Sequence, residues 1–371
     1  MTSPRHIVVA PDSFKGTISA ADAAVAIAEG WVRTSPADRF TFRPMADGGE
    51  GTLDAFEKAV PGAQRMALRV TGPAGRPVTS SWLKLPPTGE LPGGTGVVEL
   101  ANTSGIELLG DERRGTDAST LGLGQAIAAA LAAGVSRIVV GIGSSASTDG
   151  GIGMLTALGA RFLNDFEASI APGAVGLDEV HSADLTALKP LPAGGVTVLS
   201  DVTNPLTGPE GAARIFGPQK GLDDEQIERA DAGLGRLAAA LDAAELAERP
   251  GAGAAGGTGF GLLVWGAQLV PGSAAIADLT GLADDIASAD VVVTGEGRYD
   301  GQSAAGKAPA HVAQLARSAG VAVQIVAGAI DADTSSFAGA ASLTELAGSV
   351  DQALADPARY LRDAGERLAA A

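Results

Sequence analysis

The stretch D-V-V-V-T-G-E-G-R-Y-D-G-Q-S-A-A-G-K-A-P, residues 290–309, is the part of the chain that most clearly predicts the fold. Its β-branched run, Val291 to Thr294, is typical of a buried strand. Gly295 and Gly297 follow, and glycine can take backbone angles that are closed to other residues. We expect a helix to begin near Pro309, so the residues between form a strand-to-helix loop. Anions bind at such helix N-termini, which makes this loop a candidate site.

The loop is rich in polar side chains, and it includes part of a known phosphate-binding motif. The polar residues are Glu296, Arg298, Asp300, Gln302, Ser303 and Lys307. The segment from Gly301 to Lys307 satisfies the P-loop spacing G-x-x-x-x-G-K. However, Ala308 stands where a P-loop needs Ser or Thr on Mg²⁺, and Gly301 lies too far beyond the strand. A true P-loop NTPase is therefore disfavoured.

The composition of the chain narrows the class of protein. Its 371 residues suggest about two domains, and a hydrophobic content of 46% supplies ample core. The net charge of −17 argues against a nucleic-acid partner, but a local cleft can still attract a small anion. With no cysteine there is no disulfide and no thiolate metal site.

The start of the chain, M-T-S-P-R-H-I-V-V-A, passes directly into an expected strand and has no signal-peptide pattern. No run of 18 uncharged apolar residues predicts a membrane span. We therefore expect a soluble, cytoplasmic protein that binds neither membrane nor nucleic acid.

Strands followed by polar glycine-containing loops and then helices recur along the chain, which indicates an α/β fold. The expected strands are 6–10, 40–43, 137–140, 196–199, 291–294 and 321–327. The expected helices are 19–34, 117–133, 223–248, 309–319 and 351–370, with a further helix ending near 269. Between residues 64 and 101 short strands follow one another without helices, which predicts an antiparallel or mixed sheet in a second domain.

Polar residues collect where the expected strands end. They are Asp12, Lys15, Asp47, Glu50, Ser144 to Asp149, Asp201, Asn204 and Glu296 to Asp300. If the strands are parallel neighbours, these loops converge on one cleft. Several carboxylates, a few lysines and glycine-lined loops favour phosphoryl transfer, because carboxylates hold hydrated Mg²⁺ and backbone N–H groups and lysines neutralise phosphates. His6, His181 and His311 show no metal-binding spacing.

Several of the candidates also have a purely structural explanation. Asp12, Asp47 and Asp201 lie in turn-like sequences, where Asp often bonds its own backbone. Asp149 could be a helix N-cap, and Lys307 an ordinary solvated lysine.

Two other classes of function fit parts of the sequence. Gly141, Gly143 and Ala146 match the dinucleotide-binding fingerprint G-x-G-x-x-G/A, and Asp165 follows at about the right distance for a ribose. This pattern would suit an NAD(P)-dependent oxidoreductase. A non-catalytic ligand-binding protein could also use a two-domain cleft without a metal.

The sequence resembles the type-1 glycerate kinase family of bacterial glycerate 2-kinases. The motifs that carry the resemblance are A-P-D-S-F-K-G (10–16), P-M-A-D-G-G-E-G-T (44–52), G-I-G-S-S-A-S-T-D-G-G-I-G-M (141–154), D-V-T-N-P-L-T-G-P-E-G-A (201–212), F-G-P-Q-K-G (216–221), G-A-G-A-A-G-G-T-G-F-G (251–261) and T-G-E-G-R-Y-D-G-Q-S-x-x-G-K-A-P (294–309). They occur in this order and span nearly the whole chain. The resemblance implies phosphorylation of D-glycerate at its 2-hydroxyl, with ATP and Mg²⁺.

The resemblance also implies a Rossmann-like (flavodoxin-like) parallel-sheet domain and a second α/β domain with a mixed sheet, with the active site in the cleft between them. We expect the first domain to comprise residues 1–70 and 281–371, and the inserted domain residues 71–280. The loops 118–124 and 143–149 depart from the usual family pattern, so substrate tolerance and phosphorylation at the 3-hydroxyl or of a related hydroxy acid stay open.

The roles that we assign are hypotheses built on this resemblance. For catalysis we name Asp47 or Asp300 as the base, with Lys15 and Lys307 steadying the carboxylate or the phosphoryl group. For substrate binding we name Asp12, Ser13, Lys15, Arg298 and Gln302. For ATP we name Gly141, Gly143, Ser144, Ser145, Asp149 and Lys220, and for Mg²⁺ we name Asp201 and Glu296. Whether Lys307 contacts ATP or glycerate, and whether the chain forms a homodimer, stays open.

Overall fold

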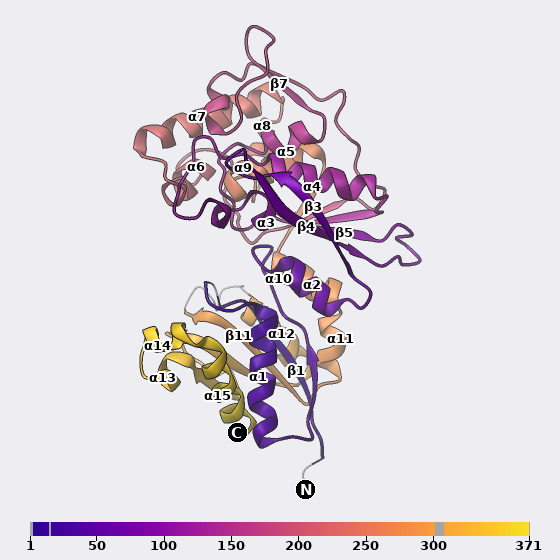
Figure 1. Ribbon diagram of the computed structural model, residues 1–371, viewed down its shortest axis with the longest axis vertical. Coiled ribbons are helices and arrows are strands. Elements are labelled where there is room, and N and C mark those ends of the chain that lie inside the picture. The colour runs from indigo at the N-terminus through magenta and orange to yellow at the C-terminus, as the bar shows by residue number, and fades with distance from the viewer. Residues whose placement is uncertain (1–2, 15, 301–307, 371) are drawn as a thin grey trace. The chain divides into compact units, whose positions relative to one another are not determined.

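The computed structural model describes residues 3–14, 16–300 and 308–370, and these residues form two compact units (Figure 1). Unit 1 comprises residues 1–47, 54–61 and 273–371. Unit 2 comprises residues 48–53 and 62–272. No helix in the described ranges is long and apolar enough to cross a membrane.

Unit 1 is built on a five-stranded sheet in the order β13-β12-β11-β1-β2, and every neighbouring pair is parallel. Its strands are β1 (His6–Pro11), β2 (Arg39–Phe42), β11 (Val291–Tyr299), β12 (Ala322–Ile330) and β13 (Gly339–Ser342). Its helices are α1 (Ala20–Thr34), α11 (Leu282–Ala287), α12 (Ala308–Ala319), α13 (Leu343–Ala347), α14 (Val350–Ala355) and α15 (Pro357–Ala369). The chain passes between the units four times: after residue 47, within α2 (Thr52–Ala59), after residue 61 and at the start of α10 (Gly272–Thr280).

Both faces of the unit 1 sheet are covered by helices. Ile7 and Val9 of β1 belong to a core cluster that includes residues of α1 and α15. Val8, which points to the opposite face, is also fully buried. Helix α12 packs against β1, β11 and β12. This arrangement is the doubly wound architecture that a buried parallel sheet requires, and the predicted fold class is confirmed.

Helices α1 and α15 lie side by side and approach closely (Figure 1). A Cβ atom added at Gly30 would lie 1.8 Å from the carbonyl oxygen of Arg362, and one added at Gly365 would lie 2.0 Å from that of Ile27. Only glycine fits at these two positions, so the two helix backbones can pack almost directly against each other.

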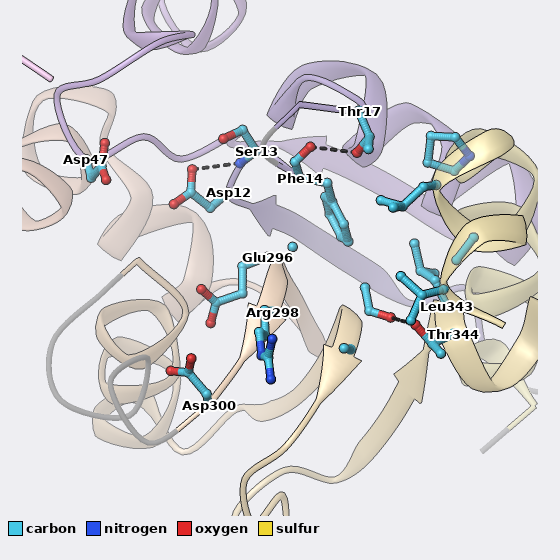
Figure 2. A pocket seen from close by; sticks show the side chains of 17 residues that line it. Asp12, Ser13, Phe14, Thr17, Asp47, Glu296, Arg298, Asp300, Leu343 and Thr344 are labelled. Carbon is cyan, nitrogen blue, oxygen red and sulfur yellow. Dashed lines mark hydrogen bonds between the residues drawn. The ribbon is translucent and has the colours of Figure 1, made fainter. Parts of the chain in front are cut away.

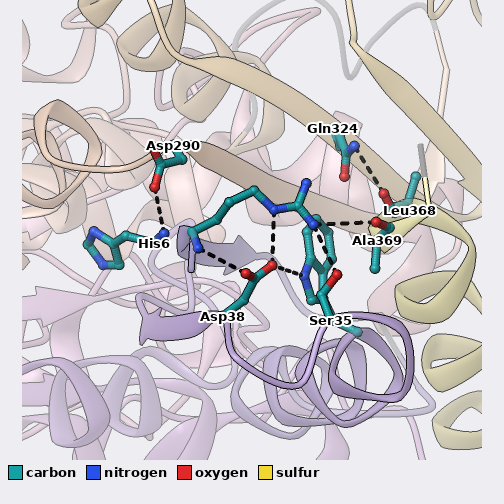
Figure 3. A network of polar contacts seen from close by, with 9 residues as sticks. His6, Ser35, Asp38, Asp290, Gln324, Leu368 and Ala369 are labelled. Atoms are coloured by element: carbon teal, nitrogen blue, oxygen red, sulfur yellow. Dashed lines mark hydrogen bonds and ion pairs between the residues drawn. The ribbon is translucent and has the colours of Figure 1, made fainter. Parts of the chain in front are cut away.

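A polar network joins the first strand to the helices of unit 1 (Figure 3). The Asp38 carboxylate accepts hydrogen bonds from the backbone N–H of Arg5 (2.9 Å), from Nε of Arg5 (3.0 Å) and from Nε1 of Trp31 (2.9 Å). The Arg5 guanidinium also donates to Ser35 Oγ and to the Ala369 carbonyl. The network therefore connects the N-terminal segment, α1 and the end of α15.

Asp38→Asn is expected to lower the free energy of unfolding at pH 7 by about 1–3 kcal/mol, the usual cost of disrupting charge-assisted hydrogen bonds. Burial acts to raise the pKa of Asp38, but the hydrogen bonds from Arg5 and Trp31 lower it on balance. A carboxyl whose pKa is lowered by folding stabilises the protein above its unfolded pKa, and this stability is lost as the pH falls through the folded pKa.

Urea denaturation at pH 7 and at acidic pH measures this difference, which should shrink as the pH falls below the ordinary pKa of an aspartate side chain. Asp284→Asn, at an exposed position of α11, is the control and should change little. An Asp38→Asn variant as stable as the wild type at pH 7 would show that the network contributes nothing.

Unit 2 contains a six-stranded mixed sheet in the order β10-β9-β6-β5-β4-β3, in which β3, β4 and β5 are antiparallel and the remaining pairs parallel. Its strands are β3 (Gln64–Thr71), β4 (Pro77–Leu85), β5 (Thr95–Glu99), β6 (Arg137–Gly141), β9 (Val196–Leu199), β10 (Gln268–Val270) and the separate pair β7 (Arg161–Leu163) and β8 (Ser182–Asp184). Its helices are α3 (Ala101–Ser104), α4 (Leu121–Ala132), α5 (Ile152–Ala157), α6 (Ala212–Phe216), α7 (Asp224–Ala240), α8 (Ala244–Ala247) and α9 (Ala254–Trp265), with short 3₁₀ turns at Ile106–Leu109, Ala174–Asp178 and Pro218–Lys220.

Strand β11 is longer than the sequence predicts. It continues past Thr294 to Tyr299, so Glu296 and Arg298 lie in the strand and not in a loop. Pairing with β12 extends to Tyr299 opposite Ile330. Gly295 and Gly297 do not adopt left-handed angles. Gly295 instead allows close approach, because a Cβ there would lie 2.3 Å from the carbonyl oxygen of Val326.

Three predicted helices end earlier or divide. The helix expected over 223–248 ends at Ala240, and Asp242 takes a left-handed φ of 50° before α8. The helix expected over 351–370 divides at Asp356, since a residue before proline avoids helical angles. The helix expected to reach residue 269 ends at Trp265, after which Gly266 turns the chain into β10.

Candidate functional site

Unit 1 contains a cavity of about 520 Å³ at the carboxyl edge of its parallel sheet (Figure 2). Its walls come from residues that follow β1 and β2, from the ends of β11 and β12, and from the helices after β13. Ligands bind at this edge in open α/β sheets, because the strand ends and their loops leave a crevice there. The cavity is therefore the candidate site of unit 1.

One end of the cavity is strongly charged. It is lined by Asp12, Asp47, Glu296, Arg298 and Asp300, and Figure 2 shows these side chains grouped on one side. The structure thus brings together the acids of three strand-end loops that the sequence predicts to converge. Among the described lining residues, four carboxylates stand against one guanidinium, a balance that favours a cation or a cation-bound anion as ligand.

The geometry of individual residues shows how the acids are held. The Asp12 carboxylate accepts the backbone N–H of Ser13 at 2.6 Å, and the Asp12 N–H donates to the Gly295 carbonyl at 2.7 Å, which ties this loop to β11. Glu296 is only 6% exposed. Arg298 is exposed and forms an ion pair with Asp331 at 2.8 Å.

Burial and the neighbouring Glu296 raise the pKa of Tyr299, which follows Arg298 in β11. The phenol therefore stays neutral at physiological pH, and it packs edge-on against Phe337 with ring centroids 5.6 Å apart. Tyr299 packs in a hydrophobic cluster with Ile325 and Ala327 and does not add to the charge of the acids.

The predicted site residues Lys15, Gln302 and Lys307 lie outside the described residues, and so does the P-loop-like segment 301–307. Their assigned roles stay predictions.

The charged end of the cavity fits a Mg²⁺ ion by its chemistry. Carboxylate oxygens are the hard ligands that Mg²⁺ prefers, and in phosphoryl-transfer sites the ion takes only one or two of them and keeps water and phosphate ligands. No group of three or more acidic, His or Cys side chains arranged to hold a metal occurs among residues 3–14, 16–300 and 308–370. A Mg²⁺ ion held by one or two carboxylates and by the phosphates of a substrate would agree with the acidic lining and with the lack of a three-residue cluster in the described part of the chain.

In unit 2, the glycines of the 141–149 loop have a packing role. A Cβ at Gly141 would lie 2.5 Å from the carbonyl oxygen of Gly48, and one at Gly143 would lie 2.4 Å from Cα of Gly49. The Gly143 N–H also donates to the Gly48 carbonyl at 2.9 Å. These two glycines allow the loop to lie against residues 48–49, which accounts for their presence without a bound phosphate.

The next residues of this loop differ in exposure. Ser144 is exposed and has a left-handed φ of 60°, unusual for a residue other than glycine. Ser145 is buried, and its Oγ accepts a hydrogen bond from Nζ of Lys220 at 2.8 Å. Of the two serines, only Ser144 presents its side chain to solvent, and the predicted roles of both in binding ATP stay predictions.

Lys220 is buried in the interior of unit 2, with 2% of its surface exposed. Besides Ser145, its Nζ donates to the Ser147 carbonyl at 2.5 Å. Burial lowers the pKa of Lys220 to about 7, an effect that the charge of Asp149 partly opposes. The lysine thus fixes the 145–147 backbone from inside, and its predicted contact with ATP stays a prediction.

Asp149 is completely buried and holds two segments together. Its carboxylate accepts the backbone N–H of Thr120 (2.9 Å), the Thr120 hydroxyl (2.8 Å) and the backbone N–H groups of Gly151 (3.1 Å) and Gly153 (3.4 Å). Burial raises the pKa of Asp149, while these hydrogen bonds oppose the rise. These contacts give Asp149 a structural role, since they hold the 149–153 segment to Thr120. Its predicted role in binding ATP stays a prediction.

Asp201, the other predicted Mg²⁺ ligand, lies in unit 2 just after β9. Its side chain is exposed, and its Oδ1 accepts the backbone N–H of Gly272 at 2.8 Å. Asp201 therefore tethers the strand end to the segment after β10, and its metal role stays a prediction.

The segment that matches the dinucleotide-binding fingerprint lacks the helix that normally begins within this motif. In that motif a helix begins within the glycine segment, so that its N-terminus meets the pyrophosphate. Here α5 begins only at Ile152, well beyond Ala146. Asp165, the expected ribose ligand, is exposed, and its Oδ1 lies 2.7 Å from Nδ1 of His181. The structure offers no support for the oxidoreductase alternative.

Sequence reasoning missed two features of these sites. Thr120, the main partner of Asp149, lies 29 positions earlier in the chain, and no local pattern connects the two. The opposite end of the unit 1 cavity is apolar and is formed largely by α13 and α14, near residues 343–354. The sequence predicts a helix only from residue 351 onward, so α13 and its place in the cavity wall were missed.

Comparisons with known proteins agree over most of the chain. The model of a family described as "Glycerate kinase family" matches residues 7–371. Glycerate 2-kinase from Escherichia coli is 41% identical over 317 residues, covering 84% of this chain and 82% of that protein. Glycerate kinase from Bacillus subtilis is 40% identical over 337 residues, covering 88% and 86%. A crystal structure from Salmonella typhimurium LT2, of a protein assigned as glycerate kinase 2, superposes with a TM-score of 0.84 at 36% identity and covers 99% of this chain and 98% of that chain.

Proposed function

The chain belongs to the glycerate kinase family, and from this premise we propose that it transfers the γ-phosphoryl group of ATP to the 2-hydroxyl of D-glycerate, giving 2-phosphoglycerate and ADP. The family membership confirms the resemblance found in the sequence. The observation that carries the proposal is the unit 1 cavity, where four carboxylates and one guanidinium meet at the carboxyl edge of a parallel sheet.

The proposed chemistry needs one carboxylate as a base. The 2-hydroxyl oxygen forms a bond to the γ-phosphorus, the bond from that phosphorus to the β,γ-bridging oxygen breaks, and the hydroxyl proton passes to the carboxylate. Asp47 and Asp300 are the proposed bases, because both are half-buried and line the charged end of the cavity. Arg298 is proposed to bind the glycerate carboxylate.

Magnesium, when bound, supplies charge neutralisation to the phosphates. Glu296 and Asp201 are its proposed ligands, since both offer hard carboxylate oxygens: Glu296 lines the charged end of the cavity, and Asp201 follows β9. Asp12 and Ser13 are proposed to contact the substrate at the same end of the cavity as Glu296. Lys15 and Lys307 are proposed to add positive charge beside the transferring group, and Gln302 to bind substrate.

The experiment that tests this function is an ADP-release assay with Mg²⁺, ATP and D-glycerate. We expect turnover that depends on D-glycerate and is absent without an acceptor. L-glycerate is the stereochemical control, and it should react more slowly because the base must reach a hydroxyl of fixed orientation. ADP release that does not respond to D-glycerate would contradict the substrate assignment.

A second measurement separates the oxidoreductase alternative. Thermal unfolding is followed with Mg-ATP and with NADH, since a ligand that binds the native state raises the melting temperature. Mg-ATP is expected to stabilise the protein and NADH is not. The reverse result would favour the dinucleotide enzyme. A cytoplasmic location and a homodimeric state stay predictions.

A further inference from the structure

We propose that the apolar end of the unit 1 cavity binds the adenine base of ATP. This inference rests on the proposed function for its assumption that ATP is the phosphoryl donor. The cavity has two chemically different ends (Figure 2). Opposite the acids, its lining includes the apolar residues Phe14, Leu343, Val350, Ala353, Leu354 and Pro357.

Two side chains of this wall are incompletely buried. Val350 is 53% exposed and Leu354 is 56% exposed. They lie one helical turn apart on α14, so they form one continuous apolar face toward the cavity. Single exposed apolar residues are common, but a pair that lines a concave, otherwise buried wall indicates a surface that a ligand covers.

The size and chemistry of the cavity favour a nucleotide over glycerate at this end. A volume of about 520 Å³ lies within the range of pockets for ligands much larger than a three-carbon acid. Glycerate carries oxygen on every carbon and gains nothing from an apolar wall. A nucleotide has a flat aromatic base at one end and an anionic chain at the other, which matches the two ends of the cavity.

The orientation of the nucleotide follows from this match. With the base against the wall near Leu354, the phosphate chain extends toward Glu296 and Asp300, where the proposed Mg²⁺ and the reacting hydroxyl would meet. The opposite orientation would place charged phosphates against apolar side chains and leave the base among carboxylates. Burying charge without a partner is far more costly than burying an aromatic ring.

Two threonine hydroxyls add a preference for adenine. Thr17 Oγ1 donates to the Phe14 carbonyl at 2.6 Å, and Thr344 Oγ1 donates to the Gly328 carbonyl at 2.8 Å. Both threonines line the cavity. Since each hydroxyl already donates its proton to a backbone carbonyl, its oxygen can act toward a ligand only as a hydrogen-bond acceptor. Such acceptors suit the exocyclic amino group of adenine better than the carbonyl that guanine carries at that position.

The test uses two exposed positions whose substitution should leave the fold intact. Leu354→Gln keeps the approximate size of the side chain and adds no charge, and it is expected to raise KM for ATP about tenfold by removing apolar contact with the base. Val350→Thr, which keeps the shape, is expected to raise it about threefold. KM for D-glycerate should change less than about twofold in both variants.

The matched control is Val25→Thr, an equally conservative change at an exposed valine of α1 outside the cavity wall. It should leave both KM values unchanged. Adenosine, which has the base but no phosphate, should compete with ATP in the wild type and lose this competition in Leu354→Gln.

The outcomes distinguish this inference from the proposed function. Turnover of D-glycerate with no effect of Leu354→Gln on KM for ATP, and no competition by adenosine, would overturn the base site and leave the kinase assignment standing. A rise in KM for D-glycerate instead of ATP would also overturn it. If no glycerate turnover occurs, yet a non-hydrolysable ATP analogue binds by calorimetry and binds more weakly in Leu354→Gln, the base site is supported and the proposed function fails.

Discussion

Replacing the catalytic base by its amide is expected to lower kcat by roughly 10²–10⁴-fold, and the two carboxylates to test are Asp47 and Asp300. Asn keeps the size and the hydrogen-bonding oxygen of Asp but cannot take up the proton of the 2-hydroxyl. We expect one of the two variants to show the full loss. The other should show a smaller effect, because it then contributes only charge and position.

Steady-state kinetics at several pH values measures this loss. The variant that lacks the base should also lose the acidic limb of the kcat/KM profile, which a merely structural substitution would not remove. Asp165→Asn, at a side chain 74% exposed in unit 2, is the control and should keep wild-type rates. If both cavity variants retained wild-type kcat, the base could be neither residue.

Asp149→Ala is expected to lower the free energy of unfolding of unit 2 by about 3–5 kcal/mol. The change leaves buried donors of Thr120, Gly151 and Gly153 without their acceptor. It also leaves Lys220 buried without the nearby carboxylate. Both losses act in the interior, where water cannot replace the missing oxygen atoms.

Urea denaturation followed by circular dichroism measures this effect, with Asp165→Ala at an exposed position as the control. The double variant Asp149→Ala, Lys220→Met should be less destabilised than the sum of the single variants, by at least about 1 kcal/mol, because the two groups interact. A loss below about 1 kcal/mol in Asp149→Ala would show that this buried cluster does not support the 141–149 loop.

Much of the fold was predictable because its signals are local. The strand at Val291 to Thr294 and the helix that follows it both formed, and Ser19 caps α1 by accepting the backbone N–H of Asp22, as its position before the helix predicts. The mixed sheet was visible as strands without intervening helices. Helix ends were less predictable. For example, α7 ends at Ala240 because Asp242 adopts a left-handed φ angle, and no local pattern in the sequence predicts that angle.

The sequence predicted that acidic residues meet at the candidate site, but it did not predict many of the contacts that hold the loops in place. Acids at the ends of β1, β2 and β11 were expected to meet, because parallel strands end at the same edge, and the cavity brings them together. The roles of Gly141 and Gly143 were not predictable, since their contacts are with residues 48–49, far away in the sequence. The same holds for the pairing of Asp149 with Thr120.

The measurement that tests the central claim most directly is the phosphorus NMR spectrum of the protein incubated with Mg-ATP and D-glycerate. The account predicts that the γ-phosphate signal of ATP disappears, that ADP forms, and that the new phosphomonoester signal matches 2-phosphoglycerate. A signal that matches 3-phosphoglycerate would contradict the position of transfer. ATP that stays intact in the presence of D-glycerate would contradict the proposed activity itself.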